Sequence, residues 1–252
     1  MNNTNPLVAW PVSHDSAHIP RTVFRCFAPP RLRPTPMRTW FTQWSEDFSA
    51  SPLVIQSRHQ EALARLAPAL LCGEQSAINI FQTEDGHLTR KALSVSSMLF
   101  HGIENDEIAH EACLQVLRAK LPASRDEHAI RRRSQAYFAG LGRAESVAHH
   151  FGQVAQLDSA VCAVMWHMQH SAVGGNSMIG RLVERIRQDE ARHVSISRQH
   201  AFTLGLSRDD YSHLGELVRG GLTHMLEFVA DSFEDIGIDA GLLFARIKRG
   251  AL

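Results

Sequence analysis

Two short segments of the chain repeat the same pair of metal-binding residue types. One reads Glu107-Ile-Ala-His110 and the other reads Glu190-Ala-Arg-His193. On a helix, a Glu and a His three positions apart share one face. Each segment can therefore offer a carboxylate oxygen and an imidazole nitrogen to the same metal ion.

A further acidic residue precedes each segment at nearly the same distance. Glu74 interrupts the apolar run LLCGEQSAINIF 33 residues before Glu107, and Asp158 lies within VAQLDSAVCAVMW, 32 residues before Glu190. In an antiparallel helical hairpin with its turn midway, both members of such a pair come to the same height. We therefore expect six ligands in one layer: Glu74, Glu107, His110, Asp158, Glu190 and His193.

Four carboxylates and two imidazoles suit a pair of divalent metal ions. Carboxylates can bridge two ions, and neutral imidazole binds Fe(II) while leaving positions open for O2. Four negative charges balance two divalent ions, which makes burial in a helical core tolerable. Next to these ligands, Asp189 could hydrogen-bond a ligand histidine and Arg192 could bind a carboxylate. The alternative for both residues is an exposed position on the helix.

Composition and charge narrow the possible classes. The chain has 252 residues, 44% of them hydrophobic, and no formal net charge, so no overall field attracts nucleic acid or an anionic membrane. We interpret the basic run Arg131–Arg133 as a solvated face. No apolar stretch approaches the ~20 residues that span a bilayer, and the N-terminus lacks the features of a secretory signal. The four cysteines form no CxxC pair, which favours a reducing cytoplasm.

Long helices must position these side chains, because the chain from residue 51 onward has few prolines and few alternating apolar runs. The predicted helices cover residues 52–83, 89–121, 124–141, 143–173, 177–204, 208–236 and 239–248. Pro68 could kink the first. Asp85-Gly86 predicts a turn after it, and we therefore set aside a third Glu-x-x-His at 84–87. Ser177 and Ser207 are predicted N-caps.

Residues 1–50 differ from the rest, since they hold seven of the ten prolines. Proline is poorly tolerated inside helices and sheets. We therefore predict an irregular, proline-rich N-terminal arm that wraps over a helical domain of residues 51–252. Trp10, Trp40 and Trp44 would anchor the arm, and a disordered leader is the alternative.

The combination of GEQSAINIF, IENDEIAHEACL, an acid inside the third long helix and QDEARHVSIS resembles the ferritin-like di-iron carboxylate superfamily. The resemblance covers about residues 52–205. It implies an all-α fold, namely an antiparallel four-helix bundle with additional C-terminal helices, which holds two Fe ions or a Mn/Fe pair and uses them to activate O2 or oxidise iron. The third-helix ligand of this superfamily is usually Glu, so Asp158 is a departure with a shorter side chain.

Within that superfamily, single positions separate the branches. A ribonucleotide reductase radical subunit would carry a tyrosine where this chain has Leu114, and an arylamine N-oxygenase would carry an extra histidine where it has Ile186. A rubrerythrin would need a cysteine-bound iron module, and a storage ferritin is shorter, without the arm or the last helices. These differences favour an oxygenase or oxidase that acts on a small organic substrate.

We therefore expect an enzyme that uses O2 to oxidise or hydroxylate a small organic molecule, with electrons from an external ferredoxin or reductase. A homodimer is compatible with the sequence. The alternatives are a ferroxidase, a tRNA-modifying hydroxylase of the same fold, or a non-catalytic helical protein whose Glu and His residues form buried ion pairs. Four residues within two turns of the ligands are candidates for a substrate pocket or else packed core: Cys72, Cys113, Cys162 and Trp166.

Overall fold

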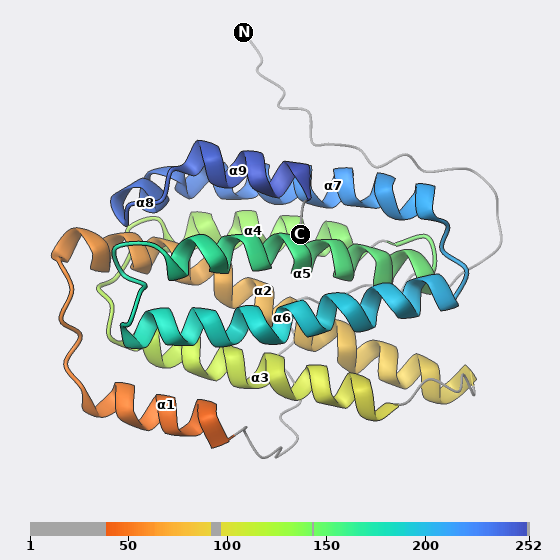
Figure 1. The fold of residues 1–252 in the computed structure, drawn as a ribbon, viewed down its shortest axis with the longest axis horizontal. Coiled ribbons are helices and arrows are strands. Elements are labelled where there is room, and N and C mark those ends of the chain that lie inside the picture. Colours follow the sequence, from red (N-terminus) through yellow and green to blue (C-terminus); the bar gives the residue numbers. More distant parts are fainter. Residues whose placement is uncertain (1–38, 92–96, 143, 251–252) are drawn as a thin grey trace, which may run out of the picture.

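The computed structural model describes residues 39–91, 97–142 and 144–250, and every regular element in these ranges is a helix (Figure 1). The all-α prediction is therefore confirmed for the described part of the chain. The elements are α1 (Thr39–Ala50), α2 (Ser57–Lys91), α3 (Ser97–Ala119), α4 (Glu127–Leu141), α5 (Val147–Gln169), α6 (Met178–Thr203), α7 (Arg208–Leu226), the 3-10 turn η1 (Glu227–Val229), α8 (Ala230–Asp235) and α9 (Ala240–Arg249).

Four of the helices form two packed pairs. α2 packs against α3, α5 packs along α6, and α3 also contacts α6. α1 lies against α3 on one side of this group, whereas α7 and α9 cover α5 on the other (Figure 1). α4 contacts both α2 and α7. The helices that carry the predicted ligands are therefore covered on two sides by further helices.

Side-chain caps fix where several helices begin. Ser177 accepts a hydrogen bond from the backbone N–H of Gly180 at the start of α6, and Ser207 accepts one from Asp210 at the start of α7. Both predicted N-caps are confirmed. Gly205, just after α6, has a φ of +96°, which glycine adopts more easily than other residues. These local signals explain why the predicted bounds of α6 are nearly those observed.

The turn predicted at Asp85-Gly86 is wrong, because α2 continues through it to Lys91. A glycine inside a helix costs only about 1 kcal/mol relative to alanine, which is too little to end a long helix. Pro68 also lies inside α2. The reason for setting aside the motif at 84–87 therefore fails, and its side chains lie outside the part that the structure describes.

Part of the segment predicted to be irregular is helical. Residues 39–50 form α1, which buries three aromatic rings at helical spacing: Phe41, Trp44 and Phe48. Trp44 Nε1 donates a hydrogen bond to the carbonyl of Met178, 2.8 Å away, so this anchor is confirmed. Trp40 is 39% exposed. Trp10 and the rest of residues 1–38 lie outside the described residues.

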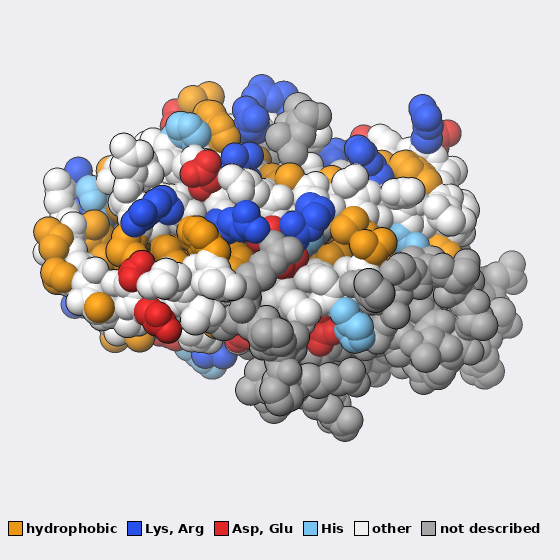
Figure 2. Space-filling view, turned by 60° about the horizontal axis from the view of Figure 1, so that its bottom comes forward, with side chains coloured by type: hydrophobic (Ala, Val, Ile, Leu, Met, Phe, Trp, Pro, Cys, Tyr) orange, Lys and Arg blue, Asp and Glu red, His pale blue; other side chains and the backbone are white. Residues whose placement is uncertain are grey.

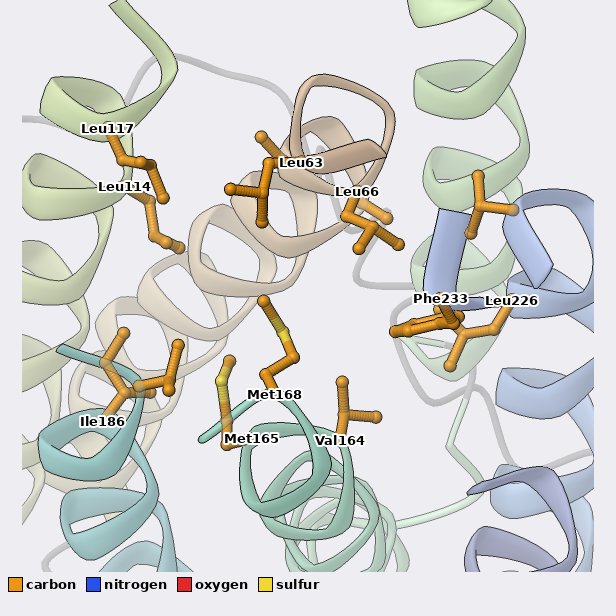
Figure 3. Packing of buried hydrophobic residues seen from close by; sticks show 14 of the residues in the cluster. Leu63, Leu66, Leu114, Leu117, Val164, Met165, Met168, Ile186, Leu226 and Phe233 are labelled. Atoms are coloured by element: carbon orange, nitrogen blue, oxygen red, sulfur yellow. The ribbon is translucent and has the colours of Figure 1, made fainter. Parts of the chain in front are cut away.

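Two apolar clusters hold the helices together. The larger one joins leucines of α2 and α3 to side chains of α5, α6, α7 and α8, and Figure 3 shows several of them converging: Leu63, Leu66, Leu114, Leu117, Met165, Met168, Ile186, Leu226 and Phe233. The smaller one includes Phe81, Phe100 and Phe151. Along α2, α3, α5 and α6, the two clusters occupy opposite ends of each helix. A layer of buried polar residues falls where they meet.

The surface shows no segregation of charge on the face in Figure 2, where basic, acidic and apolar side chains are interspersed. This agrees with the zero net charge of the sequence. None of the described helices combines the length and the apolar character that crossing a membrane requires.

Candidate metal centre

The six predicted ligands lie together in the buried polar layer. Their donor atoms form two groups, and the atoms of each group lie within 4.8 Å of one another: Glu74, Glu107, His110 and Glu190 in one, and Asp158, Glu190 and His193 in the other. All six side chains are buried. The layer therefore brings together oxygen and nitrogen donors that could hold a metal ion.

Two carboxylates lie between the two histidines. Glu107 places Oε2 3.6 Å from His110 Nδ1 and Oε1 2.9 Å from His193 Nδ1. Glu190 places Oε1 3.8 Å from His110 Nδ1 and Oε2 3.6 Å from His193 Nδ1. Each carboxylate thus directs one oxygen toward each histidine, which is the arrangement that bridging of two ions requires. Glu74 lies on the His110 side, with its Oε2 3.4 Å from His110 Nδ1.

Several donor atoms in the layer lack hydrogen bonds although they are buried. Among the described residues, neither Nδ1 of His110, nor Nδ1 of His193, nor Oδ2 of Asp158 has a hydrogen-bond partner of acceptable geometry. Buried polar atoms nearly always have such a partner, and each exception calls for an explanation. Imidazole nitrogens and carboxylate oxygens are the donor types that divalent metal ions bind, so these buried atoms fit a metal site.

The outer nitrogens of both histidines meet aspartates from the opposite helix. Nε2 of His193 on α6 donates to Asp106 Oδ2 on α3 at 3.2 Å, and Nε2 of His110 on α3 lies 3.5 Å from Asp189 Oδ2 on α6. Because Nε2 keeps its proton in these contacts, Nδ1 is the nitrogen that could lose its proton and bind a metal ion in the layer. Arg192 contacts both aspartates, with Nη1 2.9 Å from Asp189 Oδ1 and Nη2 against Asp106. The histidines are thus oriented in a crossed pattern.

Asp189 and Arg192 therefore lie beside the ligands as predicted, but Arg192 binds the two aspartates rather than a ligand carboxylate. Asp106 is a residue that the sequence reading missed. The signal was present, since an aspartate precedes the glutamate in both segments and the repeated pattern is Asp-Glu-x-x-His.

Several carboxyl groups of the layer have a raised pKa because they are buried. Burial raises the pKa of Glu74 well above its ordinary value. Burial and the neighbouring charge of Glu190 do the same to the pKa of Asp158, and burial together with Glu107 raises the pKa of Glu190. These carboxyl groups cannot all be ionised in a dry core unless positive charge is brought in. Two divalent cations would supply that charge.

Glu107 behaves in the opposite way because both histidines face it. Burial alone would raise its pKa, but interactions with His110 and His193 bring it below the ordinary range. Burial alone would lower the pKa of each histidine, and this is outweighed by Glu74 in the case of His110 and by Asp106 in the case of His193. Glu107 is therefore the carboxylate that stays ionised between the two rings.

A cavity of about 70 Å³ reaches the layer from the side of α2, α5 and α7. It is lined by Glu74, Glu107, Asp158 and Glu190, and by apolar residues that include Leu70, Gly73, Phe138, Val161, Met225 and Leu226. A single water needs about 10–15 Å³ of such space. The cavity therefore has room for several waters or for part of a small organic molecule.

The residues predicted to line a substrate pocket do not line this cavity: Cys72, Cys113, Cys162 and Trp166. Cys113 faces α1, where its Sγ lies 3.3 Å from Ser45 Oγ. Cys162 Sγ donates to the carbonyl of Arg187 at 3.7 Å, Cys72 lies in the larger apolar cluster, and Trp166 is 37% exposed. The wall of this cavity depends on where α4 and α7 dock, which helical spacing does not give.

No protein-family model, no curated protein and no solved structure matches the chain. What the protein does must therefore be inferred from the chemistry of the site itself.

Proposed function

We propose that the chain is a non-haem di-iron oxidoreductase that activates O2 to oxidise or hydroxylate a small organic substrate. On this proposal α2, α3, α5 and α6 form a four-helix bundle of the ferritin-like superfamily. The observation that carries it is the placement of Glu107 and Glu190, each with one oxygen toward each histidine. Carboxylates so placed suit two metal ions held side by side.

The ligands would divide between the two ions by their distances. Glu74 and His110 would hold one ion and Asp158 and His193 the other, with Glu190 in both donor groups and Glu107 near both histidines. Mixed carboxylate and imidazole donors suit Fe(II) and Mn(II), so a Mn/Fe pair is compatible with the same set. The bound pair supplies the electron transfer to O2 that amino-acid side chains do not provide.

The chain's own residues would keep the centre ready for that chemistry. Asp106 and Asp189 fix the rings of the two histidines, and Arg192 holds both aspartates. The carboxyl groups with raised pKa would release their protons as cations bind. Electrons would come from an external ferredoxin or reductase, since the sequence holds no CxxC pair or other iron–sulfur motif.

The alternatives are less well supported by the cavity. A ferroxidase needs a polar path along which Fe²⁺ can approach, whereas this cavity is apolar up to the four carboxyl groups. A tRNA-modifying hydroxylase needs a basic surface. Arg131 and Arg132 on α4 are exposed, but Arg133 donates hydrogen bonds to the backbone carbonyl and the ring Nε2 of His224.

Metal analysis tests the proposal directly. After anaerobic loading with Fe(II) and removal of unbound iron, we expect about two ions per chain. Glu107→Ala and Glu190→Ala should each weaken the binding of both ions, because each carboxylate faces both histidines. Glu216→Ala, at an exposed position of α7, is the matched control and should keep both.

Oxygen uptake by the loaded chain with a reductant completes the test. We expect Fe-dependent O2 consumption in the wild type and in Glu216→Ala, and its loss in the two bridging-residue variants. Less than one iron per chain in the wild type, or full iron content in both variants, would contradict the proposal.

A further inference from the structure

The cavity touches only one face of the ligand layer. Its wall includes the four carboxyl groups but neither histidine. Both histidine rings are fully buried, and their outer nitrogens face Asp106 and Asp189 on the side where Arg192 lies. A molecule in the cavity therefore reaches the layer at its carboxylate face, away from the crossed aspartates.

The chemistry of the wall limits what the cavity can hold. Apart from the four carboxyl groups, every described side chain in the wall is apolar or is that of glycine. A polar group placed among such residues loses its hydrogen bonds to water and finds no partner, which weakens its binding. Two methionines, Met165 and Met225, add a flexible surface that adapts to the shape of a ligand. The wall thus suits hydrocarbon.

One small residue sets the width of this space. A Cβ atom added at Gly73 would lie 3.5 Å from Phe138 Cζ, in ordinary contact, so a methyl group fits but a longer side chain would enter the cavity. On the far side, Leu222, Met225 and Leu226 of α7 close the wall. Helices outside the ligand-bearing four therefore shape the space beside the ligands.

We infer that the substrate of the proposed reaction is an apolar molecule, whose hydrocarbon chain or ring enters between α2 and α5 beneath α4 and α7. This inference rests on the proposed function. In the hydroxylation that it implies, one C–H bond is replaced by C–OH. One O2 is consumed. The external donor supplies two electrons and solvent supplies two protons, and the second oxygen atom leaves as water. Gly73 and Met225 determine which hydrocarbon fits.

Ligand binding tests the inference without relying on turnover. The probes are toluene and benzamide, which share a ring but differ in one polar group, titrated by calorimetry into the anaerobic Fe(II)-loaded chain. We expect toluene to bind at least about tenfold more tightly than benzamide, as expected for a lost 1.4 kcal/mol. Gly73→Leu should weaken toluene binding by at least about tenfold.

Two further variants keep the test independent of folding defects. Gly220→Leu makes the same change on α7, at an exposed glycine with nothing near its added Cβ, and should bind toluene as the wild type does. Met225→Ala enlarges the cavity and should bind naphthalene more tightly than the wild type. Equal toluene binding in wild type and Gly73→Leu, or benzamide binding as tight as that of toluene, would overturn the inference.

Iron content measured in the same samples separates the two ideas. Iron binding without toluene binding would overturn the apolar substrate and leave the di-iron proposal standing. Toluene binding without iron binding would overturn the proposed function, and with it the assignment of the bound hydrocarbon as a substrate.

Discussion

Replacing Asp106 by asparagine should weaken the binding of one of the two proposed metal ions and leave the binding of the other unchanged. Asp106 is 1% exposed, and its Oδ2 accepts a hydrogen bond from His193 Nε2 at 3.2 Å. His193 belongs to the donor group of Asp158 and Glu190. Asparagine keeps the shape and an acceptor oxygen but removes the negative charge that strengthens this hydrogen bond.

The structure sets the size of the effect. A hydrogen bond to a charged group contributes about 1.5–3 kcal/mol and a neutral one about 0.5–1.5 kcal/mol. The difference of roughly 1–1.5 kcal/mol corresponds to about a tenfold loss in metal affinity, which lies in the range found when outer partners of metal ligands are changed. Asp189→Asn should act on the His110 ion instead, and less strongly, because that contact is 3.5 Å long.

Stepwise titration of the metal-free chain with Mn(II), followed by electron paramagnetic resonance, measures the two affinities separately. For Asp106→Asn we expect one affinity to fall about tenfold and the other to stay unchanged. Asp209→Asn, at an exposed position in the first turn of α7, is the control. Unchanged affinities, or an equal loss in both, would refute the assignment of Asp106 to the His193 group.

Three other predictions concern pH, packing and reactivity. Because burial raises the pKa of Glu74, its contribution to stability is present below the ordinary carboxyl pKa of about 4 and is lost as the pH rises through the raised value. Metal-free Glu74→Gln should therefore gain in Tm relative to the wild type as the pH rises above about 5, and a constant difference would contradict this. Trp44→Ala should lower the free energy of unfolding by about 3–5 kcal/mol in a denaturant titration, because Trp44 is buried and bonded to α6. Trp40→Ala, at a 39% exposed ring, should cost less than about 1 kcal/mol. Burial raises the pKa of the Cys162 thiol, so iodoacetamide at about pH 8 should alkylate it only in denaturant, and peptide mass spectrometry showing fast modification of the folded chain would disprove this.

The local rules worked where the chain carries its own signal. Ser177 and Gly205 bound α6 through a side-chain cap and a left-handed backbone, and both are readable from residue type. The spacing of Glu and His on one helical face is equally local. The same rules failed at Asp85-Gly86, because the small cost of a glycine does not end the 35-residue helix α2.

Placement across helices was only partly predictable. Glu74 and Asp158 were found because each lies at nearly the same distance before a Glu-x-x-His segment. They reach the layer although α2 ends at Lys91, later than predicted. The cavity wall was not predictable, because it depends on where α7 and α4 dock rather than on any spacing within α2 or α5. The crossed partner Asp106 was readable in principle from the repeated Asp-Glu pair.

The crossed aspartates have a consequence for the order in which a growing chain could acquire metal. Synthesis delivers α2 and α3 first, with Glu74, Glu107 and His110, but without Glu190 to complete their donor group or Asp189 to orient His110. α6 follows α3 in the chain, so Asp106 is already present to orient His193 when α6 is made. The first hairpin alone would therefore offer copper or zinc ions, which bind more tightly, an incomplete donor group. On the proposed function, selection of the metal would fall to the fold that α6 completes.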